Sequence, residues 1–338
     1  MITKLKKIVE LTTTYCAGLL FVGDPHMTEK KPSRRLDEDY LGTLDDKLTQ
    51  VAKIANENNY QVVILGDLFD RAVEKDDNAM MRVLYKFLRS LNHTAKCLAG
   101  NHDLTETVLT PDTSLALVEM TGLLDVVSQA GFFARCMIDG KTVLLGGTPS
   151  GQEIPDEAPL TAKCKEASDH NIWITHEDLQ FPGAYPNALP FKEIKDVELV
   201  VNGHMHRLQP EHVEGETTWF NPGNIIRKTV ADIDHIPAVW SWTPAAGLNR
   251  YPLKYKKDMF DLTNYRVEKA SKEDVLESLN KMESSQFVAL LQQSIEHGKQ
   301  TEDGGLITEI MEGVHESMTL STPAKAVVDK LLKDVIEA

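Results

Sequence analysis

The fold is decided by one short stretch, Gln61-Val62-Val63-Ile64-Leu65-Gly66-Asp67-Leu68-Phe69-Asp70, an unbroken aliphatic run that stops at a glycine and an acid. A run of this kind, bounded by Gly and followed by polar residues, predicts a strand buried on both faces of a parallel sheet. Asp67 would then lie at the carboxyl end of the strand, where open α/β sheets bind their ligands. The stretch therefore predicts a functional carboxylate in the middle of a ligand-binding edge.

Four other apolar runs end in the same way, at residues 19–22, 95–99, 172–175 and 199–201. The polar residues that follow them are Asp24, His26, Asn101, His102, Asp103, His176, His204 and His206. Because the carboxyl ends of parallel strands meet at one edge of a sheet, we expect these side chains to surround Asp67. The sequence predicts a two-metal site at that edge.

Length, charge and cysteine content limit the classes of protein to consider. With 338 residues, 42% of them hydrophobic, the chain can form two packed domains. A formal net charge of −15 argues against coating nucleic acid through an overall positive field, although a local basic patch is compatible with it. Four dispersed cysteines predict neither a zinc ribbon nor a disulfide framework, and a reducing cytoplasm fits best. We expect no membrane association, since no apolar span is long enough to cross a bilayer.

Helical patterns alternate with the apolar runs at 39–58, 78–91 and 114–121. Two short runs joined by Asp139-Gly140 predict a hairpin. Further short strands are expected at 211–214, 217–220 and 238–242, forming a second sheet that closes against the first. The expected fold is an α/β sandwich of two sheets flanked by helices, with a small helical carboxyl-terminal region.

The chain is expected to divide near residue 260. Residues 1–260 carry all the candidate site residues, and residues 261–338 show only helical patterns. The last helix, 323–338, has an apolar stripe on an otherwise charged surface. That stripe either packs on its own domain or docks onto a partner or a second copy of the chain, so the region is a cap or a docking element.

The donor set suits phosphoester hydrolysis. Two cations about 3.5–4 Å apart clamp the phosphoryl oxygens and generate a hydroxide at neutral pH. Asp67 is the natural bridging carboxylate. Asp24, His26 and one distal histidine could complete one metal, and Asn101, His176 and another distal histidine the second. Nitrogen and oxygen ligands without thiolate favour manganese, iron or zinc over calcium.

Three further residues are candidates for the chemistry. His102 follows a ligand without being needed as one, so it is free to act as general acid or to stabilise transition-state charge. Asp103 is expected to orient the ring of His102 by accepting its other N–H. Asp70 either supports the site or hydrogen-bonds the backbone of its own loop. Basic residues near the motifs, at 30–35 and at Arg71, Arg207, Arg227 and Lys228, are either solvated rim charges or phosphate contacts.

Taken together, the five motifs resemble those of the calcineurin-like metallophosphoesterases, in order and at plausible separations over residues 19–245. The resemblance implies a di-metal β-sandwich in which His206 joins Asp24 and His26, and His204 joins Asn101 and His176.

Within that superfamily, residues 63–70, 82–88, 98–103 and 221–227 resemble the SbcD-type nuclease subunit of DNA repair and recombination complexes. That resemblance implies a manganese-dependent DNA exonuclease and endonuclease that works with an ABC-type coiled-coil ATPase, and a homodimer is compatible with it. The alternative is a phosphomonoesterase or small cyclic-nucleotide phosphodiesterase, which the acidic charge and short tail favour. A metal-bound scaffold without catalysis is disfavoured, because no ligand position or candidate acid is missing.

Overall fold

The computed structural model describes residues 11, 13–74, 78–159, 168–182, 184 and 187–263. The chain divides into two compact units, Met1–Phe260 and Asp261–Ala338, and every element named below belongs to the first. The helices expected in 264–338, including the apolar helix at 323–338, lie outside the described residues. The assignment of the second unit to capping or docking stays a prediction.

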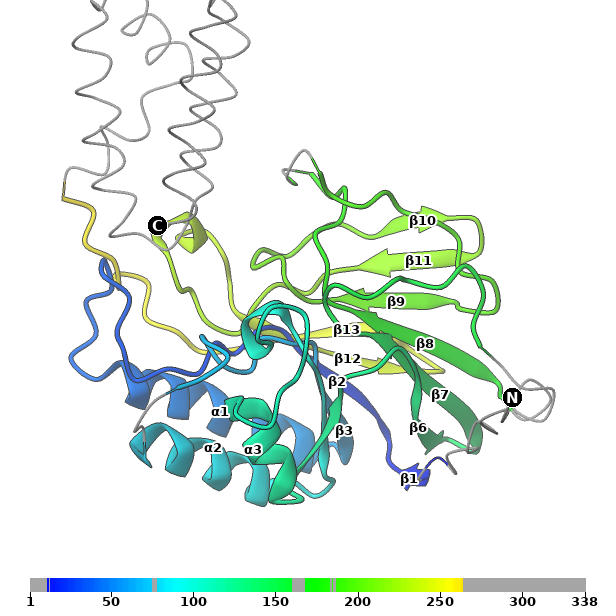
Figure 1. Cartoon of the computed structure of the whole chain (residues 1–338), viewed down its shortest axis with the longest axis horizontal. Helices are drawn as coiled ribbons and strands as arrows, with labels where there is room; N and C mark the ends of the chain where they lie inside the picture. The colour runs from blue at the N-terminus through cyan, green and yellow to red at the C-terminus, as the bar shows by residue number, and fades with distance from the viewer. Residues whose placement is uncertain are drawn as a thin grey trace, which may run out of the picture. The chain divides into compact units, whose positions relative to one another are not determined.

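Two mixed sheets form the body of the first unit (Figure 1). One has the order β13-β12-β2-β3-β4-β5 and comprises β2 (Gly18–Val22), β3 (Tyr60–Ile64), β4 (Ala95–Leu98), β5 (Leu124–Val127), β12 (Ala238–Thr243) and β13 (Gly247–Pro252). The other has the order β1-β6-β7-β8-β9-β11-β10 and comprises β1 (Thr13–Tyr15), β6 (Gly131–Ile138), β7 (Lys141–Thr148), β8 (His170–Thr175), β9 (Leu199–Asn202), β10 (His212–Glu214) and β11 (Thr217–Phe220). The expected two-sheet α/β sandwich is confirmed.

Three helices cover the outer face of the six-stranded sheet: α1 (Tyr40–Glu57), α2 (Asn78–Ser90) and α3 (Ser114–Met120) (Figure 1). α1 begins at Asp39, whose side chain accepts a hydrogen bond from the backbone N–H of Gly42 at 2.8 Å. Its apolar positions recur every three or four residues and are buried on the sheet. All three helices lie where the apolar periodicity predicts them.

The central strands are apolar throughout because they are covered on both faces. In β2, Leu20 and Val22 pack under the helices, whereas Leu19 and Phe21 pack between the two sheets. β3 alternates in the same way. This double burial explains the unbroken apolar run of residues 61–65.

The composition of the two sheets corrects two expectations. β10 and β11 extend the sheet of β8 and β9, but β12 pairs with β2, so the late strands do not form a sheet of their own. The five motif-bearing strands also do not share one sheet edge. β2, β3 and β4 belong to one sheet and β8 and β9 to the other, so the site lies where the carboxyl ends of two sheets meet.

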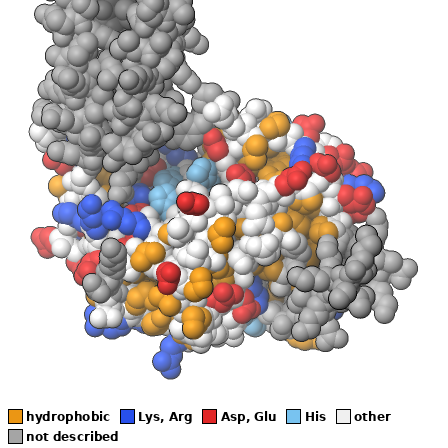
Figure 2. Space-filling view, in the orientation of Figure 1, with side chains coloured by type: hydrophobic (Ala, Val, Ile, Leu, Met, Phe, Trp, Pro, Cys, Tyr) orange, Lys and Arg blue, Asp and Glu red, His pale blue; other side chains and the backbone are white. Residues whose placement is uncertain are grey.

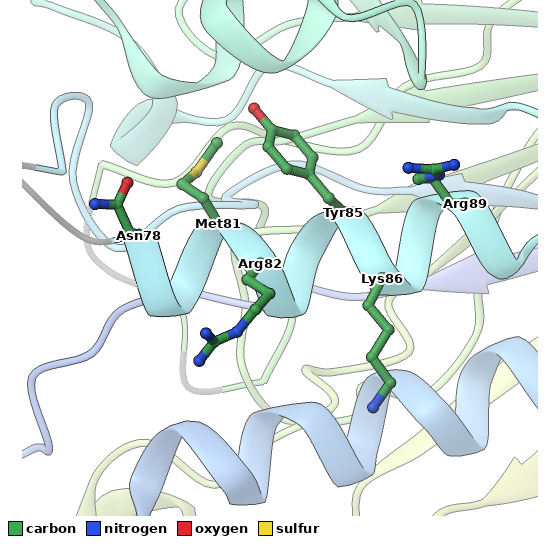
Figure 3. Close-up of a pocket in the computed structure, with 6 residues that line it drawn as sticks. All are labelled: Asn78, Met81, Arg82, Tyr85, Lys86 and Arg89. Carbon is green, nitrogen blue, oxygen red and sulfur yellow. The ribbon is translucent and has the colours of Figure 1, made fainter.

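A surface hollow of about 520 Å³ lies along α2 and is lined by Asn78, Met81, Arg82, Tyr85, Lys86 and Arg89 (Figure 3). In this view the Lys86 side chain extends toward α1, where its Nζ lies 2.8 Å from Asp45 Oδ2. None of the lining residues belongs to the predicted metal site. Among the described helices, none combines the length and apolarity needed to span a membrane.

Candidate metal centre

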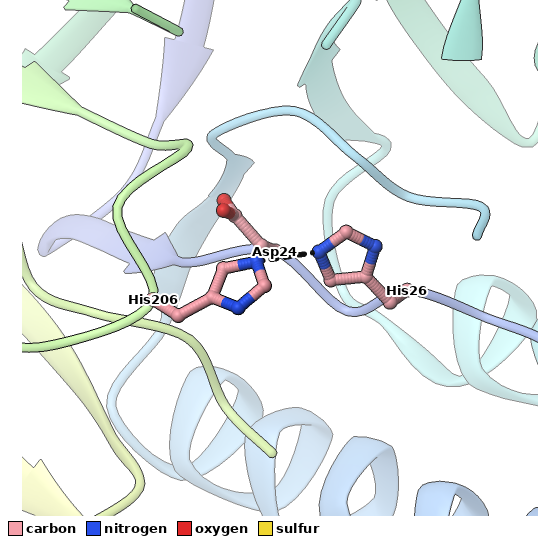
Figure 4. A group of neighbouring side chains, drawn as sticks. All are labelled: Asp24, His26 and His206. Carbon is pink, nitrogen blue, oxygen red and sulfur yellow. Dashed lines mark hydrogen bonds between the residues drawn. The ribbon is translucent and has the colours of Figure 1, made fainter. Parts of the chain in front are cut away.

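The first group of donors comes from the end of β2 and the loop after β9. Asp24, His26 and His206 place one ligand atom each within 4.8 Å of one another, and the two Nε2 atoms of the histidines are 2.9 Å apart (Figure 4). The Asp24 side chain is buried, and neither carboxylate oxygen has a hydrogen-bond partner. A buried carboxylate without a partner is costly, so this group has the donors and the charge that a cation would satisfy.

The second group lies at the ends of β3, β4, β8 and β9. His176 Nε2 lies 3.2 Å from Asp67 Oδ2 and 3.1 Å from Asn101 Oδ1. His204 Nδ1 lies 3.0 Å from the same Asn101 oxygen. The His176 Nδ1–H donates to the carbonyl oxygen of Leu65 at 2.9 Å, which leaves Nε2 free to bind a metal.

Asp67 lies between the two groups. Its Oδ2 is 3.2 Å from His176 Nε2 and 3.8 Å from His26 Nε2, while its Oδ1 accepts the backbone N–H of His102 at 2.9 Å. One oxygen is thus held by the backbone and the other faces both histidine sets. This is the position expected of a bridging carboxylate.

The backbone around the centre is strained. His26, Asp67 and His204 have φ values of 43°, 45° and 69°, in the left-handed region that non-glycine residues seldom adopt. Such strain gathers at functional sites, where the surrounding structure holds it. Gly66 has a φ of 117°, and a Cβ there would lie 2.2 Å from His176 Nδ1. Glycine at this position allows the ends of β3 and β8 to approach each other.

The pKa values of Asp24 and His176 are shifted because these groups are buried close to other ionisable side chains. Burial raises the pKa of Asp24. Burial opposes charge on His176, yet the Asp67 carboxylate beside it raises the pKa of His176 to about 10. In the absence of a cation, a proton on His176 therefore balances the negative charge of the Asp67 carboxylate. Buried, unpartnered carboxylate oxygens, converging imidazole nitrogens and the lack of thiolate fit two divalent cations.

His102 lies beside these groups and is partly exposed, and Figure 2 shows histidine side chains gathered at one place on the surface. Its Nδ1–H donates to the backbone carbonyl of Asp70 at 2.7 Å, and its Nε2 lies 4.0 Å from Asp67 Oδ2. His102 also forms a third donor group with His26 and Asp67. Its side chain is 38% exposed, so Nε2 is accessible to a substrate.

The expectation that Asp103 orients the His102 ring is wrong. The Asp103 carboxylate is fully buried and accepts backbone N–H groups from Leu68, Phe69 and Gly100 at 3.0–3.2 Å. Asp103 therefore ties the loop after β3 to the loop after β4. The contact to the ring comes instead from Asp70, through its backbone carbonyl.

Two buried asparagines that the sequence analysis overlooked hold the loop carrying His204 and His206. Asn202 accepts from Thr175 Oγ1 at 2.8 Å and donates to Asn221 Oδ1 at 3.1 Å. Asn221 donates to the carbonyls of Met205 and Arg207 at 2.7 and 3.1 Å. An asparagine that ends an apolar strand and a second one before Pro-Gly are the signals that could have revealed them.

Three of the basic residues considered as phosphate contacts are bonded to other groups of the protein, and two of them, Arg35 and Arg227, are buried. Arg35 forms a bidentate pair with Asp37 at 2.7 and 2.8 Å. Arg227 donates to the carbonyl of Ile233 at 2.9 Å and lies over the Tyr255 ring. Arg207 donates to the carbonyl of Ala231. Because each of these side chains is bonded within the protein, the phosphate-contact alternative is not supported at these three positions.

Comparison with protein families matches residues 18–208 to the calcineurin-like phosphoesterases. The chain belongs to this family. The matched segment contains all seven predicted metal ligands and His102, and this phosphoesterase is accordingly a metal-dependent hydrolase. No protein of curated function matches its sequence.

Two solved structures share a distant likeness with this phosphoesterase. The 5′-nucleotidase precursor from Thermus thermophilus has 14% identity and a TM-score of 0.42, covering 77% of this chain and 59% of its own. The NAD nucleotidase of Haemophilus influenzae has 13% identity and a TM-score of 0.41, covering 69% of this chain and 54% of its own. This chain spans less than two thirds of either protein, and likenesses this distant do not bear on its substrate.

Proposed function

We propose that this phosphoesterase hydrolyses small phosphoesters, with phosphomonoesters as its first substrate class. The observation that carries the proposal is the pairing of two donor groups around Asp67 with an accessible imidazole, His102, beside them. Asp24, His26, Asp67 and His206 would hold one divalent cation. Asp67, Asn101, His176 and His204 would hold the other.

The chain's own residues account for binding and proton transfer. Two bound cations supply the charge stabilisation and water activation that phosphoester cleavage requires. Asp67 offsets their mutual repulsion. His102 donates its Nδ1–H to the Asp70 carbonyl, so that Nε2 faces outward, and in the imidazolium form the Nε2–H can transfer its proton to the leaving oxygen. Before transfer, this Nε2–H can stabilise negative charge on the phosphoryl group.

The charges around the centre favour a small substrate over a polymer. A protein that tracks DNA neutralises several phosphates with Lys and Arg. Here the side chains of Arg35, Arg207 and Arg227 are bonded to partners within the protein, and the chain carries a formal net charge of −15. A single phosphate bound directly at the metal centre needs no such track.

A DNA phosphodiesterase of the SbcD type is the second candidate. It is supported by the motif resemblance and by Lys30 and Lys31, which are exposed in the loop that follows His26. This second candidate would also imply a DNA substrate, an ABC-type ATPase partner and a homodimer, and all three remain proposals. Manganese as the preferred metal and a cytoplasmic location likewise stay predictions.

The deciding experiment compares substrates under one set of conditions. The full chain, stripped of metal and reloaded with manganese, zinc or iron, is given nucleoside 5′-monophosphates, NAD, a cyclic nucleotide, bis-p-nitrophenyl phosphate, and labelled single- and double-stranded DNA. The Asp67→Asn variant, prepared in the same way, controls for contaminating phosphatase. A higher kcat/KM for monoesters than for any diester supports the proposal.

Processive degradation of DNA with little turnover of monoesters would instead establish the second candidate. Stoichiometric metal binding without turnover of any of these substrates would instead favour a metal-bound scaffold without catalysis.

A further inference from the structure

The metal centre is flanked by a buried ion pair that its chemistry does not use. Lys228 lies in the segment between β11 and η2 (Val230–Asp232), and its side chain is 10% exposed. Its Nζ lies 2.5 Å from Asp70 Oδ1, and the Asp70 side chain is 8% exposed. Buried ammonium groups are unfavourable unless paired, so both partners are held in one arrangement.

Asp70 links this pair to two residues of the centre. Its Oδ1 lies 3.5 Å from Nδ1 of His26, and its backbone carbonyl accepts the Nδ1–H of His102 at 2.7 Å. Its backbone N–H donates to the carbonyl of Met27 at 3.1 Å. The loop after β3 is thus connected on one side to the loop after β2 and on the other to His102.

The backbone of Lys228 is held in place by hydrogen bonds to Asp232. Its backbone N–H donates to Asp232 Oδ2 at 3.0 Å, and the neighbouring Thr229 N–H donates to the same oxygen at 3.0 Å. The preceding residue, Arg227, is buried and donates to the carbonyl of Ile233. The ammonium therefore projects from a braced segment and is not a mobile surface cation.

We propose that Lys228 is a positioning residue, which holds Asp70 so that the Asp70 carbonyl orients the His102 ring toward the reacting phosphate. Lys228 acts through Asp70 and does not contact the substrate, because its ammonium is buried against the carboxylate. The kinetic consequence rests on the hydrolysis proposed above. The effect on the His102 ring does not, so the two can fail separately.

The test uses the full chain with Lys228→Met, Asp70→Asn and the double variant that combines them. Lys96→Met is the matched control, because Lys96 is also a buried lysine paired with an aspartate, Asp125, on the β4–β5 pair. With a phosphomonoester as substrate, Lys228→Met should lower kcat about 10- to 100-fold with little change in KM, the usual effect of removing a residue that orients a functional group. Lys96→Met should leave kcat unchanged.

A second readout needs no turnover. In metal-free protein with ¹⁵N-labelled histidine, the hydrogen-bonded Nδ1–H signal of His102, assigned by its loss in His102→Ala, should disappear or exchange faster in Lys228→Met. It should persist in Lys96→Met. Retention of this signal in Lys228→Met would overturn the proposal.

Lys228→Met leaves the buried Asp70 carboxylate without its ion-pair partner, and the double variant removes that charge as well. The double variant can therefore be measured even if Lys228→Met does not fold. Because Lys228 acts through Asp70, adding Lys228→Met to Asp70→Asn should lower kcat no further. The positioning role would be overturned if the kcat losses of the two single variants multiplied in the double variant. It would also be overturned if Lys228→Met raised KM and left kcat unchanged, because that result would indicate direct contact with the substrate.

Discussion

Asp67 is the single residue on which both donor groups depend. Asp67→Asn replaces a carboxylate that faces His26 and His176 with a neutral amide, which bridges two cations poorly. We expect hydrolysis to be abolished and metal content, measured by elemental analysis of the purified protein, to fall. Full metal occupancy with normal turnover would exclude the bridging role.

His102 is expected to behave differently, because it donates a proton and does not hold a metal. His102→Ala should slow turnover by about a hundredfold or more while both metals remain bound. Calorimetric metal titration and phosphoester kinetics on the same preparation check this. Since His102 also lies within reach of His26 and Asp67, the loss of one metal would reassign it as a ligand.

At the scale of the element, the loop of residues 203–207 is placed by asparagine side chains. Asn221→Ala removes the donors to the carbonyls of Met205 and Arg207. Leaving them unsatisfied costs about 1–3 kcal/mol of stability, and metal affinity should fall about 10- to 100-fold because His204 and His206 lose their support. Chemical denaturation and metal titration measure the two effects.

Asn171→Ala is the control for this prediction. Asn171 lies at the opposite end of β8 from His176, and its side chain donates to the carbonyl of Asp196 at 2.9 Å. It should lower stability without changing metal affinity. Equal losses of metal affinity in both variants would show that the effect of Asn221→Ala is general.

For the whole molecule, the unpartnered donors predict strong stabilisation by metal. One cation at a hundred times its dissociation constant stabilises the folded state by about 2.7 kcal/mol, which corresponds to a Tm rise of about 5–10 °C for a domain of this size. Calorimetry with manganese and with a chelator measures the difference. Asp67→Asn should show a much smaller one.

This stabilisation should grow with pH. Without metal, the pKa of His176 is raised to about 10 by Asp67, although burial opposes it. A raised pKa in the folded state contributes stability that is complete below the unfolded value of about 6.5 and is lost as the pH rises toward 10. The metal-free Tm should therefore fall between pH 6.5 and 8.5 more than the manganese-loaded Tm, because the cation replaces the proton. Parallel curves would show that His176 is not protonated in the metal-free centre.

The local pattern of the chain was sufficient to predict its three described α-helices, most of its strands and the polar residues that end five of those strands, but not β1, β5 or β13. A run apolar at every position, such as 61–65, reports burial on both faces, and the residues that end such runs lie at strand ends in any arrangement of the strands. Helices α1 to α3 follow from apolar spacing in the same way. These features depend on residues that are close together in the sequence, so they can be predicted from the sequence alone.

Only the tertiary structure decided which strands share a sheet and which polar groups meet. β12 follows β11 in the order of strands along the chain but pairs with β2, because pairing depends on contacts between distant segments. Asp103 lies next to His102 in the chain, yet its carboxylate turns to three backbone N–H groups, and a carbonyl 32 residues away orients the ring. Arg227 and Lys228 read as surface charges and are buried. Adjacency in sequence does not specify the direction of a side chain, which is set by packing and by the hydrogen bonds that burial requires.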